Sequence, residues 1–183
     1  MSTLQLLRVG SSEPALVREL ARQLETEFQI PCEVLSRIAD PEFAFHPERQ
    51  QYHSSEILGW MEGQITAATW RLLAVTAADL YIPILTFVFG EARLDGKTAL
   101  VSIHRLRQEF YGLPTDAGLL RGRLLREAVH ELGHTFALRH CDRWECAMAS
   151  SSSVEAIDLK GASLCPICRA KVLGASRLRA PGR

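Results

Sequence analysis

The chain lacks the features that mark membrane proteins and nucleic-acid-binding proteins. Its 21 basic and 21 acidic residues give a formal net charge of zero, so no global field attracts nucleic acid or an anionic membrane. The longest apolar run, residues 80–89, is too short to cross a bilayer. The first residues do not show the charged segment, apolar core and cleavage site of a secretory signal peptide. We therefore expect neither a membrane nor a nucleic acid as a partner.

Cysteine is scarce over most of the chain and gathers near its C-terminal end. Of five cysteines, only Cys32 lies early in the sequence, and beside Pro31 it is expected to be a buried strand thiol. The spacing of the other four, C-x4-C and then C-x2-C, is similar to that of zinc ribbons and favours metal binding over ordinary buried thiols. Thiolate ligands in a chain without a secretion signal indicate the reducing cytoplasm. The four cysteines are Cys141, Cys146, Cys165 and Cys168.

The run HELGH at positions 130–134 carries most of the predicted chemistry. His130 and His134 are four residues apart, so on a helix they share one face and can each give a nitrogen to one metal ion. Glu131 stands beside the first histidine, where it can act on a metal-activated water without binding the metal. The pattern predicts a metal-dependent hydrolase with Glu131 as general base. Two ordinary helix histidines are the alternative interpretation, which the residues that follow disfavour.

A third ligand is predicted from helix geometry. His140 lies six residues after His134. On a continuous helix this is about 9 Å further along the axis and on another face. The chain must therefore leave the helix between them and fold back. Some zinc peptidases use a downstream glutamate as the third ligand, so the rivals of His140 are Glu145 and Glu155.

The longer run HELGHTFALRHC, residues 130–141, is called the zinc motif below. It resembles the metzincin motif H-E-x-x-H-x-x-G-x-x-H at every position except the glycine, which is Ala137 here. C-A-M at 146–148, D-L-K at 158–160 and C-P-I-C at 165–168 extend the similarity. Together these motifs resemble the archaemetzincins over about residues 126–171.

This resemblance implies a zinc-dependent peptidase with two zinc ions per chain and a peptide or protein as substrate. A catalytic ion would be held by three histidines and a structural ion by four cysteines. The bend after the helix would fall at Ala137, where a left-handed conformation costs on the order of 1–2 kcal/mol. Met148 would pack beneath the catalytic ion. The implied ligands are His130, His134 and His140 for the first ion, and Cys141, Cys146, Cys165 and Cys168 for the second.

The two expected metal sites are joined by a single peptide bond. His140 would bind the catalytic ion and Cys141 the structural one, so the cysteine site would fix the segment that delivers the third histidine. A structural zinc contributes about 10 kcal/mol or more in peptides. That contribution is large beside any strain at Ala137.

Hydrophobic periodicity predicts a mixed α/β fold. We expect a mostly parallel, twisted sheet with an antiparallel edge strand, a long zinc-binding active-site helix and a small C-terminal zinc subdomain. The first strand, helix and strand imply a parallel crossover. Asp95-Gly96 between two β-rich runs predicts a two-residue hairpin turn. Strands are expected at residues 4–9, 30–35, 71–77, 86–94 and 97–106, helices at 14–28, 54–61 and 114–137, a loop at 38–51 and a bend at 78–83.

Three parts are expected along the chain. They are a metallopeptidase core over residues 1–140, a cysteine zinc subdomain over 141–171 and a basic tail over 172–183. The tail contains no acidic and no aromatic residue, so we expect it to be solvated rather than stacked on nucleic acid. As in metzincins, a peptide would lie extended beside residues 86–94.

Two other functions stay open at this point. In the first, Ala137 has degraded the helix site, and the protein is a non-catalytic, zinc-stabilised binding protein. In the second, the helix site is inert and the cysteine region is a nucleic-acid-binding zinc ribbon, whose binding would depend on salt. Zinc-dependent peptide hydrolysis that disappears in Glu131→Gln would separate the peptidase from both.

Overall fold

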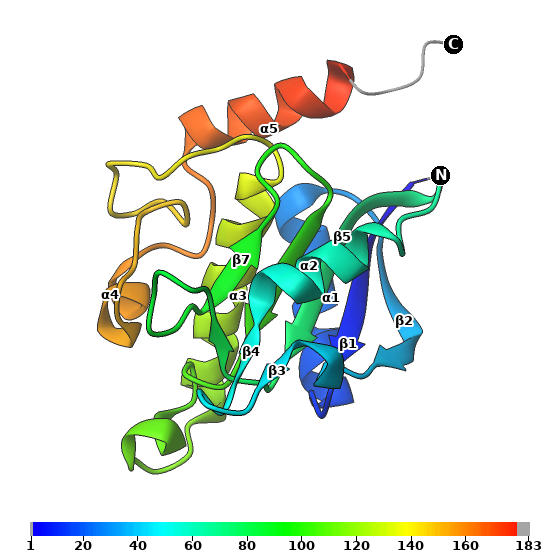
Figure 1. Ribbon diagram of the computed structural model, residues 1–183. Helices are drawn as coiled ribbons and strands as arrows, with labels where there is room; N and C mark the ends of the chain where they lie inside the picture. Colours follow the sequence, from blue (N-terminus) through cyan, green and yellow to red (C-terminus); the bar gives the residue numbers. More distant parts are fainter. Residues whose placement is uncertain (1, 179–183) are drawn as a thin grey trace.

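Figure 1 shows the computed structural model of the protein, which describes residues 2–178. A five-stranded sheet in the order β2-β1-β5-β8-β7 runs through its centre. Strands β2, β1, β5 and β8 are parallel, and β7 pairs with β8 in the antiparallel sense at one edge. This arrangement confirms the predicted fold class. The strands span Thr3–Val9 (β1), Cys32–Ala39 (β2), Thr69–Thr76 (β5), Gly90–Ala92 (β7) and Thr98–Ser102 (β8).

Helices cover both faces of this sheet. Helices α1 and α3 pack on one face, and α2 packs on the other. Because side chains alternate along a strand, β1 gives Leu4 and Leu6 to the first core and Leu7 and Val9 to the second. All four are almost completely buried, so the sheet forms a rigid base for α3. The helices span Pro14–Phe28 (α1), Ser54–Glu62 (α2) and Ala117–His134 (α3).

Smaller elements complete the described part of the chain. A second sheet has the order β3-β4-β6, and an isolated bridge joins Leu80 to Val88 in the segment before β7. Helices α4 and α5 follow the zinc motif. The bounds are Phe45–His46 (β3), Gln51–His53 (β4), Leu80–Tyr81 (β6), Val154–Leu159 (α4) and Pro166–Leu178 (α5), with short 3-10 helices at Glu42–Ala44 and Gln108–Tyr111.

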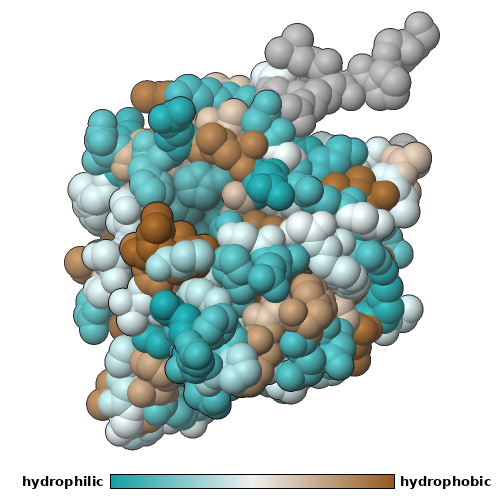
Figure 2. All heavy atoms as spheres, viewed as in Figure 1, coloured by the Kyte–Doolittle hydropathy of each residue, from teal (hydrophilic) through white to brown (hydrophobic). Residues whose placement is uncertain are grey.

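None of the helices in residues 2–178 combines the length and the apolar character needed to cross a bilayer. On the face shown in Figure 2, hydrophobic residues form separate small groups within a largely hydrophilic surface. That face therefore offers no broad apolar area.

Most predicted elements lie close to the observed ones. Helix α1 has the predicted bounds, while β2 begins two residues later than predicted and continues to Ala39. The predicted loop at 38–51 also holds β3, a 3-10 helix and the start of β4. Helix α3 begins at Ala117 rather than at residue 114, because Asp116 caps it and accepts the N–H of Leu119 at 2.8 Å.

The predicted hairpin exists, but the prediction that its turn consists of the two residues Asp95-Gly96 is wrong. The strand ladder closes where the N–H of Arg93 donates to the Thr98 carbonyl at 3.0 Å, which leaves residues 94–97 as the loop. Asp95 has a φ of 57°, and its N–H donates to the His134 carbonyl at 3.0 Å. The longer loop thus attaches the hairpin to the end of α3, and β7 is shorter than predicted.

The cysteine region shares the core formed with α1 and α3. Cys146, Ala147, Met148 and Val172 are buried in that core. The region contains α4 and the first part of α5, two helices that the hydrophobic periodicity did not predict. The predicted basic tail begins within α5, and its last residues, 179–183, lie outside the described residues.

Candidate active site

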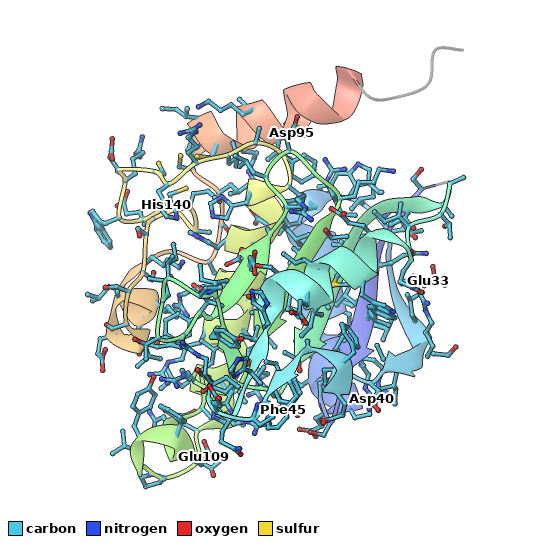
Figure 3. All side chains as sticks on the ribbon, in the orientation of Figure 1. Glu33, Asp40, Phe45, Asp95, Glu109 and His140 are labelled. Atoms are coloured by element: carbon cyan, nitrogen blue, oxygen red, sulfur yellow. The ribbon has the colours of Figure 1, made fainter. Side chains whose placement is uncertain are left out.

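Three histidines of the zinc motif meet at the C-terminal end of α3. His130 and His134 lie one turn apart, with their Nε2 atoms 3.1 Å from each other. His140 comes from the loop after the helix (Figure 3), and its ring centre lies 5.3 and 5.4 Å from the other two. One nitrogen from each ring falls within 4.8 Å of the others. The structure therefore brings the three predicted histidines together.

The two helix histidines are held in the tautomer that a metal ligand needs. His130 donates from Nδ1 to the Ala147 carbonyl at 2.9 Å, and His134 donates from Nδ1 to the Leu138 carbonyl at 2.7 Å. A carbonyl only accepts, so each Nε2 keeps a lone pair, and the two Nε2 atoms face each other without a shared hydrogen. Burial, aided by the charge of Lys160, lowers the pKa of His130 to about 3, and burial lowers that of His134. Neutral, convergent nitrogens fit a zinc ion.

The chain reverses at Ala137, as the resemblance implied. Ala137 has a φ of 60°, in the left-handed region. Its N–H donates to the His134 carbonyl at 3.0 Å, and the N–H of Leu138 donates to the Gly133 carbonyl at 3.3 Å. This pair of hydrogen bonds is the Schellman motif that ends many helices. It aims the Leu138 carbonyl at the His134 ring and returns the chain so that His140 joins the other histidines.

A buried arginine that the sequence did not single out supports this reversal. Arg71 on β5 is 3% exposed, and its Nε donates to the Thr135 hydroxyl at 2.8 Å. Its guanidinium lies 4.0 Å from the centre of the Phe136 ring. The Thr135 hydroxyl donates in turn to the Leu132 carbonyl at 2.6 Å. Strand β5 therefore fixes the residues that follow the second histidine of the motif.

Glu131 is enclosed between α3 and β7. Gly90 on β7 is so close that a Cβ atom there would lie 2.8 Å from Glu131 Oε1 and 2.6 Å from the Leu100 carbonyl oxygen. Only glycine lets the strand pass the carboxylate at this distance. Burial, reinforced by the Glu127 carboxylate, raises the pKa of Glu131 well above its ordinary value. A buried carboxyl group with a raised pKa is suited to accept and return a proton.

A tight turn at residues 146–149 holds Met148 against α3. The N–H of Ala149 donates to the Cys146 carbonyl at 2.9 Å. Met148 is fully buried, and a Cβ atom on Gly133 would lie 2.3 Å from its sulfur. Gly133 directly precedes His134, so the methionine packs on the surface of α3 next to the second histidine. The same turn carries the Ala147 carbonyl that orients His130.

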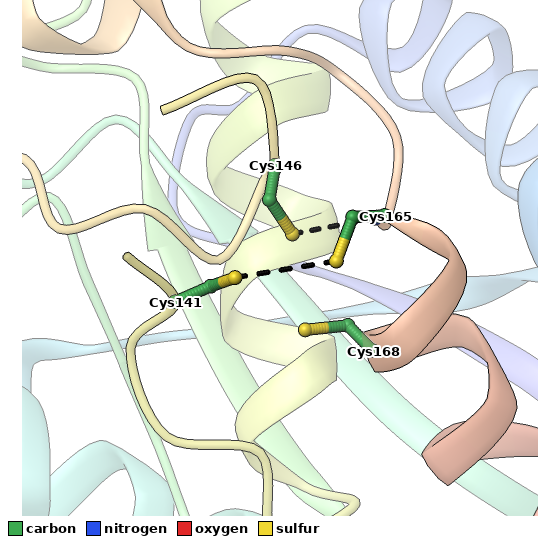
Figure 4. Close-up of side chains that lie close together, drawn as sticks. All are labelled: Cys141, Cys146, Cys165 and Cys168. Carbon is green, nitrogen blue, oxygen red and sulfur yellow. Dashed lines mark hydrogen bonds between the residues drawn. The ribbon is translucent and has the colours of Figure 1, made fainter. Parts of the chain in front are cut away.

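Four cysteine sulfurs converge in a second cluster (Figure 4). Their Sγ atoms lie within 4.8 Å of one another, and all four cysteines are free. The sulfurs of Cys141 and Cys165 are 4.0 Å apart. A disulfide would bring them to about 2.05 Å. Two sulfurs at about 2.3 Å from a tetrahedral zinc would be roughly 3.8 Å apart, so the cluster fits such an ion.

Backbone hydrogen bonds link the two clusters. Cys146 Sγ accepts the N–H groups of Met148 at 3.4 Å and Cys165 at 3.3 Å. The N–H of Cys141 donates to the Met148 carbonyl at 2.9 Å. Because Cys141 follows His140 directly, the segment that delivers the third histidine is tied to both the cysteine cluster and the methionine turn.

A buried ion pair lies beside the histidines. Lys160 and Glu127 are 4% exposed each, and Lys160 Nζ is 2.7 Å from Glu127 Oε1. The same Nζ is 3.4 Å from His130 Nδ1. Lys160 ends the D-L-K run at 158–160, and no residue near it in the sequence marks it as part of the site. Glu127 lies four residues before Glu131 on the same helix face, so helix spacing could have placed Glu127 at the site, but not Lys160.

The histidine site opens into a cleft of about 640 Å³. One wall is the segment 85–92, which includes β7, and Ser150, Ser151 and Ser152 line another part. The floor holds Glu127, Glu131 and the three histidines. The predicted edge strand thus borders the candidate site.

Comparison with known proteins assigns this arrangement to a family. The sequence profile of Peptidase family M54 matches residues 16–173. The chain belongs to peptidase family M54. The archaemetzincin of Methanocaldococcus jannaschii is 39% identical to it over 164 residues, covering 90% of this chain and 89% of the relative. The archaemetzincin of Thermococcus kodakarensis is 42% identical over 131 residues, which cover 71% of this chain and 70% of the relative. The resemblance to archaemetzincins is confirmed.

Solved structures agree with this assignment to M54. A zinc-dependent peptidase from Methanocorpusculum labreanum superposes with a TM-score of 0.84 at 30% identity, over 92% of this chain and 99% of that one. The archaemetzincin of Archaeoglobus fulgidus, complexed with malonate, gives a TM-score of 0.78 at 34% identity, with coverages of 92% and 99%.

The remaining candidates of this M54 chain lie apart from the site. Glu145 and Glu155, the rival third ligands, are exposed and do not belong to the histidine group found among the described residues. Cys32 is the half-buried first residue of β2, and burial raises its pKa to about 12, so it stays a neutral thiol.

Proposed function

We propose that the protein is a zinc-dependent peptidase with two zinc ions per chain. The catalytic ion would be bound by the three convergent histidines and the structural ion by the four cysteines. The observation that carries the proposal is the pair of unprotonated Nε2 atoms that face each other beside a buried carboxyl group in an open cleft. Membership of peptidase family M54 supports it. The ligands are His130, His134, His140, Cys141, Cys146, Cys165 and Cys168.

Bound zinc supplies the Lewis acidity that activates water and polarises the scissile carbonyl. The chain itself supplies proton transfer. Glu131 would accept a proton from the attacking water on its carboxylate and return it to the leaving amine. The raised pKa of Glu131 supports the first step, because a carboxylate with a raised pKa is a stronger base toward the attacking water.

The substrate would bind as an extended peptide along β7. This strand pairs only with β8 in the five-stranded sheet, so its other side is the sheet edge. Backbone hydrogen bonds from an edge strand can hold a peptide in register. The Phe89 side chain and the exposed Leu85 and Leu94 line the cleft and offer apolar contacts to substrate side chains.

The two competing functions have less support. The degraded-site hypothesis rested on Ala137, yet Ala137 adopts the left-handed bend that the motif requires. The nucleic-acid hypothesis requires an independent zinc ribbon, whereas Cys146, Cys165 and Cys168 lie in the core shared with α3. We keep the peptidase core at 1–140, the cysteine subdomain at 141–171 and the basic tail at 172–183 as a proposed division. Zinc-binding thiolates favour a reducing compartment such as the cytoplasm.

A digest of a peptide library tests the function. Zinc-loaded protein should cleave library peptides, and Glu131→Gln should lose at least about 100-fold in kcat, the usual scale of general-base catalysis. The amide keeps the size of the side chain, so zinc content should stay at two ions. Equal cleavage by both proteins would refute Glu131 as the base, and zinc loss in Glu131→Gln would make it a ligand.

A further inference from the structure

We propose that Lys160 and Glu127 are positioning residues for the metal site. Their ion pair fastens the turn at residues 146–149 to the catalytic helix and thereby fixes the ring of His130. The inference rests on the proposed function, because it assigns a role within the same site.

The contacts of Lys160 Nζ carry this inference. It lies 2.7 Å from Glu127 Oε1 on α3 and donates to the carbonyl of Ala149 in the turn at 3.4 Å. It is also 3.4 Å from His130 Nδ1. The Nδ1–H group already donates to the Ala147 carbonyl at 2.9 Å, so Lys160 forms its ion pair with Glu127 and its hydrogen bond with the Ala149 carbonyl. Lys160 therefore bridges helix and turn beside the hydrogen bond that orients His130.

Lys160 is itself held in place by α3. Its carbonyl accepts from Arg126 Nε at 2.8 Å, one residue before Glu127. One turn earlier, Arg123 forms a two-bond ion pair with Asp158, at 2.8 and 2.6 Å. The Arg126 hydrogen bond thus holds the backbone of Lys160 on α3, whereas the Arg123–Asp158 pair docks α4 on α3 at a separate point.

Stability alone does not account for a buried pair of this kind. Removing two charges from water costs several kcal/mol per ion, and apolar residues of similar volume often serve stability as well or better. A role in the metal site does account for it, because groups that orient ligand histidines typically change metal affinity or activity by about 10–100-fold.

The test removes both charges at once. In the double variant Glu127→Leu, Lys160→Met the volumes are nearly kept and no lone charge stays buried. We expect it to fold, with zinc affinity at the histidine site lowered about 10–100-fold. We expect kcat to fall by a similar factor and KM to change little. The double variant alters the orientation of the His130 ring but leaves the segment 85–92, which would bind the substrate, unchanged. Zinc affinity is measured by chelator competition with the cysteine site filled.

A matched control removes the neighbouring ion pair, which joins α3 to α4. Arg123→Met, Asp158→Leu should alter the thermal midpoint but keep the parent zinc affinity, since the hydrogen bonds of Arg123 reach only Asp158 and the Leu106 carbonyl in the described structure. Should the first double variant fail to fold, Glu127→Asp keeps the charges, shortens the reach and should still weaken zinc binding. A folded variant with parental zinc affinity and kcat overturns the proposal. If the parent protein cleaves no peptide, the proposed function fails. The zinc affinity of the histidine site, compared between parent and double variant, still tests whether the ion pair positions His130.

Discussion

Replacing Ala137 by glycine tests the chain reversal that makes the zinc motif a three-ligand site. Ala137 is held at a φ of 60° by the hydrogen bonds that end α3. A non-glycine residue in this conformation costs about 1–2 kcal/mol. Glycine removes that cost but gives the unfolded chain more freedom, which takes back about 0.4–1 kcal/mol. The net expectation is a stabilisation of roughly 0.8 kcal/mol.

The assay is thermal unfolding of zinc-loaded protein. For a chain of this size, each kcal/mol of added stability raises the unfolding midpoint by about 2–4 °C. The midpoint of Ala137→Gly should therefore rise by about 2–3 °C. Ala170→Gly is the matched control, since Ala170 is exposed inside α5 and should lose about 1 kcal/mol by helix propensity. The two variants should therefore shift in opposite directions. A lower midpoint for Ala137→Gly would refute the strain argument.

Two further substitutions probe how the site is enclosed and coupled. Gly90→Ala places a Cβ atom 2.6 Å from the Leu100 carbonyl and 2.8 Å from Glu131 Oε1, so β7 must shift. We expect a loss of about 1–3 kcal/mol in stability and a large loss of kcat; unchanged peptide cleavage would show that β7 does not enclose Glu131. Cys141→Ser should weaken zinc at both sites, because it removes a sulfur ligand of the structural ion from the residue that directly follows His140. Zinc titration of the histidine site in this variant measures the coupling, and parental affinity there would contradict it.

Local signals predicted the parts of this fold that depend on neighbours in sequence. The periodicity of α1 gave its bounds, and the spacing of His130, His134 and His140 required the break that Ala137 provides. The four cysteines were found for the same reason, since ligand spacing is a local property of the chain.

Long-range contacts account for what the sequence did not reveal. The hairpin turn is longer than Asp95-Gly96 alone suggests, because the Asp95 N–H bonds to the end of α3. Arg71 is buried and donates to Thr135, which lies 64 residues later in the sequence. Lys160 is buried and forms an ion pair with Glu127. Charged residues are usually exposed, so no local pattern marks a buried one. Such residues become visible only when their partners are placed in space.

Zinc content measured together with peptide cleavage tests the central claim most directly. Protein stripped by a chelator is titrated with zinc while native mass spectrometry counts ions and a cleavage assay follows hydrolysis. We predict a final state of two ions per chain, four thiols protected from titration, and hydrolysis that appears as the histidine site fills. A plateau at one ion with four titratable thiols, or hydrolysis by the zinc-free chain, would contradict the account.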